Sequence, residues 1–224
     1  MPPLLVRTPP AFLPYADRQQ VAFCGDSLTN GNQSVNTGGY RFKLMELIAA
    51  MNGEVPPNVV GADYNNVYSY AMIGASGMRS DQILNTYVTP QLAAIPSITM
   101  PVAPDVVFLL AGTNDMLQGV AKGTWLGYET NIIDAFRVAN PDCHVFVGNL
   151  IDRDTYTSTV TDWNTDLLAM LQARADWGTF VHHVDLYTAV GAYGATYYAD
   201  QTHPNTKGYN LMGTAWFSAY DLIF

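Results

Sequence analysis

The stretch PDVVFLLAGTND, residues 104–115, decides the fold of this chain. It contains an unbroken apolar run, Val106–Leu110, which begins shortly after a proline and ends before Gly112. A short apolar run with such boundaries is typical of a strand that is buried on both faces of a parallel sheet. The chain continues with a helical apolar pattern at 125–138 and another apolar run at 144–150. This order of strand, helix and strand predicts an α/β fold.

The same alternation extends over the rest of the sequence. Further strands are predicted at 21–24, 59–60, 67–73 and 180–184, further helices at 40–51, 81–92, 161–175 and from Pro204 onward, and loops at 28–39 and 186–201. Strands that alternate with helices form a mainly parallel sheet with helices on both faces. We expect an irregular, proline-rich arm over residues 1–18 and one domain over residues 19–224.

The composition argues against several classes of protein. Apolar residues make up 49% of the chain and charged residues 13%, which is typical of a globular rather than a disordered protein. The net charge is −9 and basic residues are scattered, so we expect neither a nucleic acid nor a membrane as partner. The N-terminus lacks the pattern of a signal peptide. We expect a soluble protein, cytoplasmic or secreted with its leader removed, and leave its oligomeric state open.

The two cysteines, Cys24 and Cys143, stand at the end of one apolar run and at the start of another. If these runs are parallel strands, the thiols lie at opposite ends of the sheet, too far apart for a disulfide. We therefore expect both thiols to be free and buried.

Four short polar segments carry the residues suited to chemistry. They are GDSLT at 25–29, GASG at 74–77, GTND at 112–115 and DQTHPN at 200–205. The first three follow predicted strands, and the carboxyl ends of parallel strands form the ligand crevice of an open sheet. We therefore expect these distant segments to meet at one edge of the sheet.

A serine and a histidine in these segments suit nucleophilic catalysis. A serine hydroxyl becomes a good nucleophile when a base takes its proton, and a third group must orient that base. This reasoning makes Ser27 the candidate nucleophile, His203 its base and Asp200 the orienting acid.

The remaining histidines fit neither a base nor a metal site. His144 starts a predicted strand, away from the edge where the polar segments meet. His182 and His183 are adjacent on another strand, so they face opposite sides and cannot easily bind one ion. We expect neither a metal nor a cofactor.

Acyl transfer also requires donors for the negative oxygen of the transition state. Gly77 can bring its backbone N–H close because it has no side chain, and Asn114 can offer a side-chain amide. The backbone N–H of Ser27 is the third candidate. Taken alone, Gly77 is more often a turn residue and Asn114 more often a helix cap.

The four segments resemble the four blocks of the SGNH (GDSL) hydrolases. The matching residues are Gly25-Asp26-Ser27, Gly77, Gly112-Thr113-Asn114-Asp115 and Asp200-Gln201-Thr202-His203, in the same order. The resemblance implies a flavodoxin-like three-layer α/β/α sandwich with a five-stranded sheet, and ester hydrolysis without a metal. It further implies a nucleophile at Ser27, oxyanion donors at Ser27, Gly77 and Asn114, and an Asp200–His203 pair.

Longer stretches are similar to the acetyl xylan esterase-like carbohydrate esterases. They are residues 38–41, 77–83, 112–116 and 203–209. This similarity favours short-chain, especially acetyl, esters of small molecules or carbohydrates as substrates. A lipase or thioesterase with the same catalytic residues, and a carbohydrate-binding module without turnover, are the alternatives.

Several neighbouring residues keep two interpretations. Asp26 and Asp115 are expected to stabilise their loops by hydrogen bonds, and Arg79 either contacts substrate or is a solvated cation. Four tyrosines precede the candidate base and either meet the substrate or pack their own loop; they are Tyr187, Tyr193, Tyr197 and Tyr198.

Overall fold

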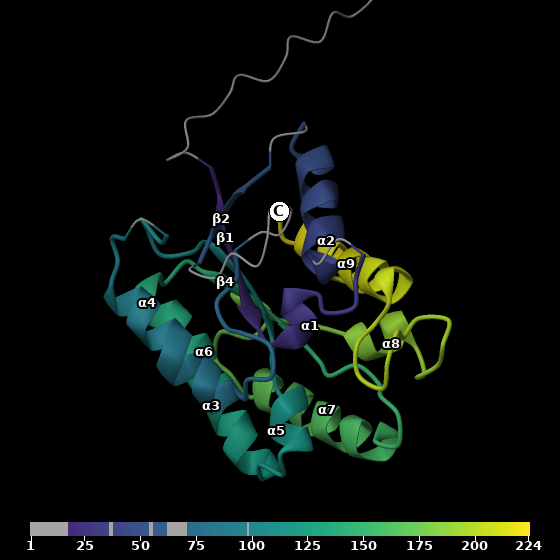
Figure 1. Ribbon diagram of the computed structural model, residues 1–224. Coiled ribbons are helices and arrows are strands. Elements are labelled where there is room, and N and C mark those ends of the chain that lie inside the picture. The colour runs from purple at the N-terminus through teal and green to yellow at the C-terminus, as the bar shows by residue number, and fades with distance from the viewer. Residues whose placement is uncertain (1–17, 36–37, 54–55, 62–70, 98) are drawn as a thin grey trace, which may run out of the picture.

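Five parallel strands form the central sheet, in the order β2-β1-β3-β4-β5. The computed structural model describes residues 18–35, 38–53, 56–61, 71–97 and 99–224 (Figure 1). The strands are β1 (Gln20–Gly25), β2 (Asn58–Val60), β3 (Val106–Leu110), β4 (His144–Gly148) and β5 (Val181–Val184). The predicted α/β class and five-stranded parallel sheet are therefore confirmed.

The strand β3 lies in the middle of the sheet, and all of its residues are buried. It pairs with β1 in register from Val21↔Val106 to Gly25↔Leu110, and with β4 on its other side. Because successive side chains point to opposite faces of a strand, β1 places Phe23 in one core and Cys24 in the other. The uninterrupted apolar run in the sequence follows from this burial on both faces.

Helices cover both faces of the sheet (Figure 1). One core is closed by α2 (Gly39–Met51), α8 (Leu186–Val190) and α9 (Thr206–Asp221). The other is closed by α3 (Ser80–Ile83), η2 (Leu84–Val88), α4 (Thr89–Ala93), α6 (Lys122–Ala139) and α7 (Thr157–Gln172). Two short helices, α1 (Ser27–Asn30) and α5 (Thr113–Leu117), start just beyond the carboxyl ends of β1 and β3. The result is a three-layer α/β/α sandwich.

Three local predictions were wrong because side-chain caps create helix starts that apolar spacing does not show. The loop predicted at 28–39 begins with α1, whose N-cap Asp26 accepts a hydrogen bond from the Leu28 N–H. The loop predicted at 186–201 begins with α8, capped in the same way by Asp185. The last helix starts at Thr206 rather than at Pro204, because Asn205 caps the N–H groups of the first turn.

Two predictions fall on parts of the chain that are not described. Residues 1–17 of the expected arm and most of the candidate strand at 67–73 lie outside the described residues. The last residue of that candidate strand, Ile73, forms a single parallel bridge with Cys24 at the end of β1. This bridge brings the segment that carries Gly77 to the edge where β1 ends.

Cys24 and Cys143 are free and buried, as predicted. Burial raises the pKa of the Cys143 thiol to about 12 and raises that of Cys24 well above its ordinary value. Both thiols are therefore protonated at neutral pH. No helix in the described part of the chain is long and apolar enough to cross a membrane.

Candidate active site

The polar segments meet where the strand order reverses. From β1 the chain passes to β2 on one side, and it later returns to β3 on the other side of β1. In open α/β sheets, ligands bind at such a point, beyond the carboxyl ends of the strands. A pocket of about 360 Å³ opens there, and its lining residues are Ser27, Asn32, Ser76, Gly77, Asn114, Leu117, Thr202 and His203.

A continuous chain of hydrogen bonds joins Ser27, His203 and Asp200. The Ser27 Oγ lies 2.9 Å from His203 Nε2, and His203 Nδ1 lies 2.9 Å from Asp200 Oδ2. The backbone N–H groups of Thr202 and His203 donate to Asp200 Oδ1 at 2.8 and 2.7 Å. The turn that carries the histidine thus fixes its carboxylate partner as well.

The Asp200 carboxylate sets the state of the imidazole. Burial by itself would raise the pKa of Asp200, but the N–H groups of His203 and Thr202 and the His203 ring outweigh it, and the pKa is lowered. An ionised carboxylate only accepts hydrogen bonds, so Nδ1 of His203 carries the proton. In the neutral ring with this tautomer, Nε2 has the lone pair and lies against the Ser27 hydroxyl, which is the arrangement a general base requires.

Asp26 supports the turn on which Ser27 stands, as the sequence led us to expect. Its Oδ1 accepts from the Leu28 N–H at 2.9 Å, and its Oδ2 accepts from Asn114 Nδ2 at 3.0 Å. Burial raises the pKa of Asp26 to about 7 despite these donors. One buried carboxyl group thus joins the segment after β1 to the segment after β3.

Two residues that line the pocket have backbone N–H groups without an acceptor in the described part of the chain. Within the described residues, the N–H groups of Ser27 and Gly77 donate no hydrogen bond. Gly77 has a φ of +80°, in the left-handed region, while a Cβ there would meet nothing within 4 Å. The glycine is therefore required by backbone conformation rather than by lack of space.

The side chain of Asn114 lines the pocket and is held from two sides. Its Nδ2 donates to Asp26 Oδ2 and to the carbonyl oxygen of Met78, both at 3.0 Å. The N-cap of α5 is Gly112, so the alternative interpretation of Asn114 as a helix cap is wrong. Gly112 has a φ of +119°, and a Cβ there would lie 2.4 Å from Trp125 Nε1.

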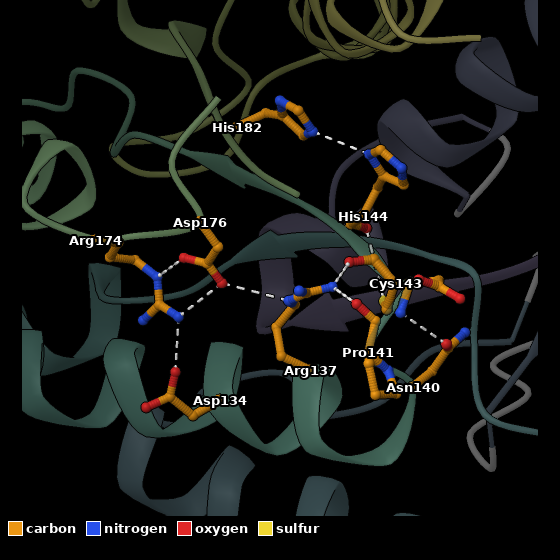
Figure 2. Close-up of polar contacts among 10 residues, drawn as sticks. Asp134, Arg137, Asn140, Pro141, Cys143, His144, Arg174, Asp176 and His182 are labelled. Carbon is orange, nitrogen blue, oxygen red and sulfur yellow. Dashed lines mark hydrogen bonds and ion pairs between the residues drawn. The ribbon is translucent and has the colours of Figure 1, made fainter. Parts of the chain in front are cut away.

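Arg79 is bound to neighbouring side chains rather than to the pocket lining. It forms an ion pair with Asp81 at 2.9 Å and donates to Gln118 Oε1 at 2.9 Å. Within the described residues, no group of histidines, cysteines and carboxylates is arranged to hold a metal ion. His144 and His182 lie at the opposite end of the sheet and contact each other (Figure 2).

The tyrosines before His203 do not line the pocket. Tyr198 is buried, Tyr193 is exposed, and their ring centroids lie 5.2 Å apart. Tyr187 instead borders a smaller hollow beside β5, with His183 and Asp185. Contacts of this kind favour packing within the loop for Tyr193 and Tyr198.

The sequence did not predict two polar residues that line the pocket, Asn32 and Ser76. Asn30 Nδ2 donates to Asn32 Oδ1 at 2.9 Å and to Ser76 Oγ at 3.0 Å, and Ser76 Oγ donates to Asn32 Oδ1 at 3.2 Å. Ser76 stands directly before Gly77, so block two offered a signal for it. Asn32 lies in a polar loop where the sequence gives no signal for one asparagine over another.

The fold and the pocket define a three-layer α/β/α hydrolase of the SGNH type. Residues 23–211 match the GDSL-like lipase/acylhydrolase family. The chain therefore belongs to this family and is a carboxylic ester hydrolase. A search of curated proteins gave no match.

Solved structures share the fold at low sequence identity. A carbohydrate esterase of family 3 from Talaromyces cellulolyticus is 22% identical with a TM-score of 0.74, covering 92% of this chain and 98% of that one. A mutant acetyl esterase with acetate ion has the same identity and coverage and a TM-score of 0.73. The lipase Lip_vut3 from a goat rumen metagenome is 18% identical with a TM-score of 0.66, covering 90% of this chain and 97% of that one.

Proposed function

We propose that this protein hydrolyses short-chain esters, above all acetyl esters of carbohydrates or other small polar alcohols, through an acyl-enzyme on Ser27. The hydrogen-bond chain from Ser27 Oγ through His203 to Asp200 carries this proposal, because it opens onto the pocket at the switch point. A carbohydrate-binding module would have no use for a serine and a histidine in bonding contact.

The reaction has two halves, with His203 moving the proton in each. Ser27 Oγ attacks the ester carbonyl carbon while His203 Nε2 takes the hydroxyl proton. The tetrahedral intermediate collapses, the bond to the alcohol oxygen breaks, and His203 returns the proton to the leaving alcohol. Water, deprotonated by His203, then attacks the acyl-enzyme and releases the carboxylic acid and Ser27.

The N–H groups of Ser27 and Gly77 are the oxyanion donors in this mechanism. Both are free of acceptors within the described part of the chain. Asn114 is the third donor, and it must share with the oxyanion one of the two N–H groups now bonded to Asp26 and Met78. Donors of this kind act most strongly in the transition state, when the oxygen becomes charged.

The pocket lining favours a small acyl group and a polar alcohol. Leu117 is the one apolar side chain among the eight residues that line the pocket. The Asn32 and Ser76 side chains offer hydroxyl-binding groups at the rim. A lipase would need an apolar groove for its acyl chain, and no such lining borders the described pocket. The similarity in fold to an acetyl esterase and a carbohydrate esterase is in keeping with this substrate class.

The proposal is tested by labelling and by substrate length. A fluorophosphonate should modify Ser27, as located by peptide mapping, and acetyl esters of p-nitrophenol should turn over faster than palmitoyl esters. Ser218→Ala, on the exposed face of α9, serves as a control that keeps both label and activity. An adduct on another serine would refute the nucleophile, whereas faster hydrolysis of palmitoyl esters would favour the lipase alternative.

A further inference from the structure

A buried network of two carboxyl groups and one hydroxyl lies behind the pocket. Ser80, the first residue of α3, donates from its backbone N–H to Asp115 Oδ2 at 2.9 Å. Its Oγ lies 3.1 Å from the same Asp115 oxygen and 2.8 Å from Glu129 Oε1 on α6. The indole N–H of Trp125 donates to Glu129 Oε1 at 3.2 Å. Ser80, Asp115 and Glu129 are all buried, with exposed fractions of 0%, 0% and 1%.

This network joins the two chain segments that supply oxyanion donors. Ser80 follows Gly77 by three residues, and Asp115 follows Asn114 by one. The contact between Ser80 and Asp115 therefore ties the segment after Ile73 to the segment after β3. A shift in this contact moves the Gly77 N–H relative to the Asn114 amide, and donors for an oxyanion must be held in place before the reaction starts.

The hydroxyl of Ser80 has a single proton but two carboxyl partners. If Asp115 and Glu129 were both ionised, Ser80 could donate to one of them, and the other would face a bare oxygen lone pair. Two buried negative charges on one hydroxyl would also repel each other in a medium of low dielectric constant. One of the two carboxyl groups must therefore carry a proton.

The surroundings place that proton on Glu129. Burial raises the pKa of Asp115, but Asp115 Oδ2 accepts both the N–H and the hydroxyl of Ser80, and these two hydrogen bonds lower that pKa. Glu129 lies in the interior of α6, between apolar residues of the core. Burial, together with the negative charges of Asp115 and Asp26, raises the pKa of Glu129 to about 8. The hydrogen bonds of Glu129 lower the pKa but do not outweigh these effects.

We propose that Glu129 is a positioning residue, whose protonated carboxyl group donates to Ser80 Oγ so that Ser80 donates to Asp115. These hydrogen bonds hold the oxyanion donors of Gly77 and Asn114 in place. The proposal rests on the assignment of Gly77 and Asn114 as oxyanion donors. Glu129 itself does not line the pocket and touches no substrate. Its effect on the reaction therefore passes through Ser80 and Asp115.

Ionisation of Glu129 disrupts the hydrogen bonds that join Glu129, Ser80 and Asp115. The groups that face its charge are Cys24 at the end of β1, Asp26 on the turn after β1, Asp115 on α5, Ser80 on α3 and Trp125 on its own helix. None of them is a cation, so a carboxylate at Glu129 has no counter-charge among them. Above the pKa of Glu129, the Ser80 hydroxyl is shared by two carboxylates and the oxyanion hole loses its fixed geometry. Activity should therefore fall as the pH rises past about 8.

Glu129→Gln separates this proposal from a merely structural role. A glutamine amide is neutral at every pH, and with its Nε2 in the place of Oε1 it donates an N–H to Ser80, although the Trp125 N–H then loses its acceptor. We expect the variant to keep kcat on p-nitrophenyl acetate near neutral pH and to lose the alkaline decline of the wild type. Ser80→Ala removes the shared hydroxyl and should lower kcat by roughly tenfold or more, with little change in KM. Ile132→Ala, a buried truncation on the same helix, should lower Tm without changing the pH profile.

Two results would overturn the proposal. One is an alkaline decline in Glu129→Gln equal to that of the wild type. The other is a wild-type kcat in Ser80→Ala, a change of a single hydroxyl that provides the test even where Glu129→Gln does not fold. Ser27→Ala is assayed in parallel. Hydrolysis by Ser27→Ala at the wild-type rate would instead refute the proposed function, so the two failures can be told apart.

Discussion

The two ends of the sheet each hold a histidine in contact with a polar partner, but the partners differ in charge. At the carboxyl end, His203 contacts the Asp200 carboxylate on one side and Ser27 on the other. At the amino end, His144 Nδ1 lies 3.1 Å from His182 Nε2, with their rings stacked (Figure 2). Burial, with His144 beside it, lowers the pKa of His182 to about 4. Burial thus keeps His182 neutral at the amino end, whereas at the carboxyl end the Asp200 carboxylate orients the His203 ring towards Ser27.

The amino end also contains ion pairs that hold elements together instead of facing a pocket. Arg137 on α6 pairs with Asp176 at 3.3 Å and donates to the carbonyl oxygens of Pro141 and Cys143 (Figure 2). Its guanidinium carbon also lies 4.0 Å from the ring centroid of Phe180. These contacts tie α6 to the segments that lead into β4 and β5. The comparison indicates that access to a pocket and the charge of the partner, not the presence of histidine, distinguish the candidate active site from the histidine pair at the amino end.

The largest contrast should appear when each histidine is removed. We expect His203→Ala to lower kcat by roughly 10⁴–10⁶, because members of a catalytic triad act as a unit. His182→Ala should leave kcat within about threefold of the wild type, since His182 lies at the opposite end of the sheet and no contact among the described residues links it to the pocket. Both are measured on p-nitrophenyl acetate, with circular dichroism to verify the fold. Equal losses in the two variants would remove the distinction between the ends.

A smaller effect is expected at Asn114, whose amide either donates to the oxyanion or only supports the structure. Asn114→Ala removes an amide that lines the pocket and ties Asp26 to Met78. If this amide donates to the oxyanion, kcat should fall by roughly 10²–10³ with little change in KM. The matched measurement is Tm, because an amide that only supports structure would lower Tm and leave kcat unchanged. A variant with a lower Tm and an unchanged kcat would show that Asn114 has a structural role alone.

The parts of the molecule that could be predicted from sequence are those encoded by local pattern. The apolar run of β3 and the four polar segments are continuous in sequence, so the sheet and the edge that carries the candidate site could be predicted from them. The start of α9 could not be predicted from Pro204, because a competing cap at Asn205 decided it. Glu129 gave no signal, since one carboxylate in a helical pattern is normally exposed, and its burial depends on Ser80, which lies far away in sequence.

The smallest effect concerns stability at acidic pH and belongs to the amino end. An unfolded histidine binds a proton below its ordinary pKa of 6.5, whereas folded His182 does so only near pH 4. The unfolded state therefore binds more protons between these values, and the free energy of unfolding falls as the pH drops through this window. His182→Gln removes one such group but keeps an amide near His144, whose own lowered pKa remains. We expect Tm to fall less steeply from pH 6.5 to 4 in this variant than in the wild type. Each kcal/mol corresponds to about 2–4 °C for a chain of this size. Parallel curves for the two proteins would mean that the histidine pair does not resist protonation, and that the two ends of the sheet differ in access alone.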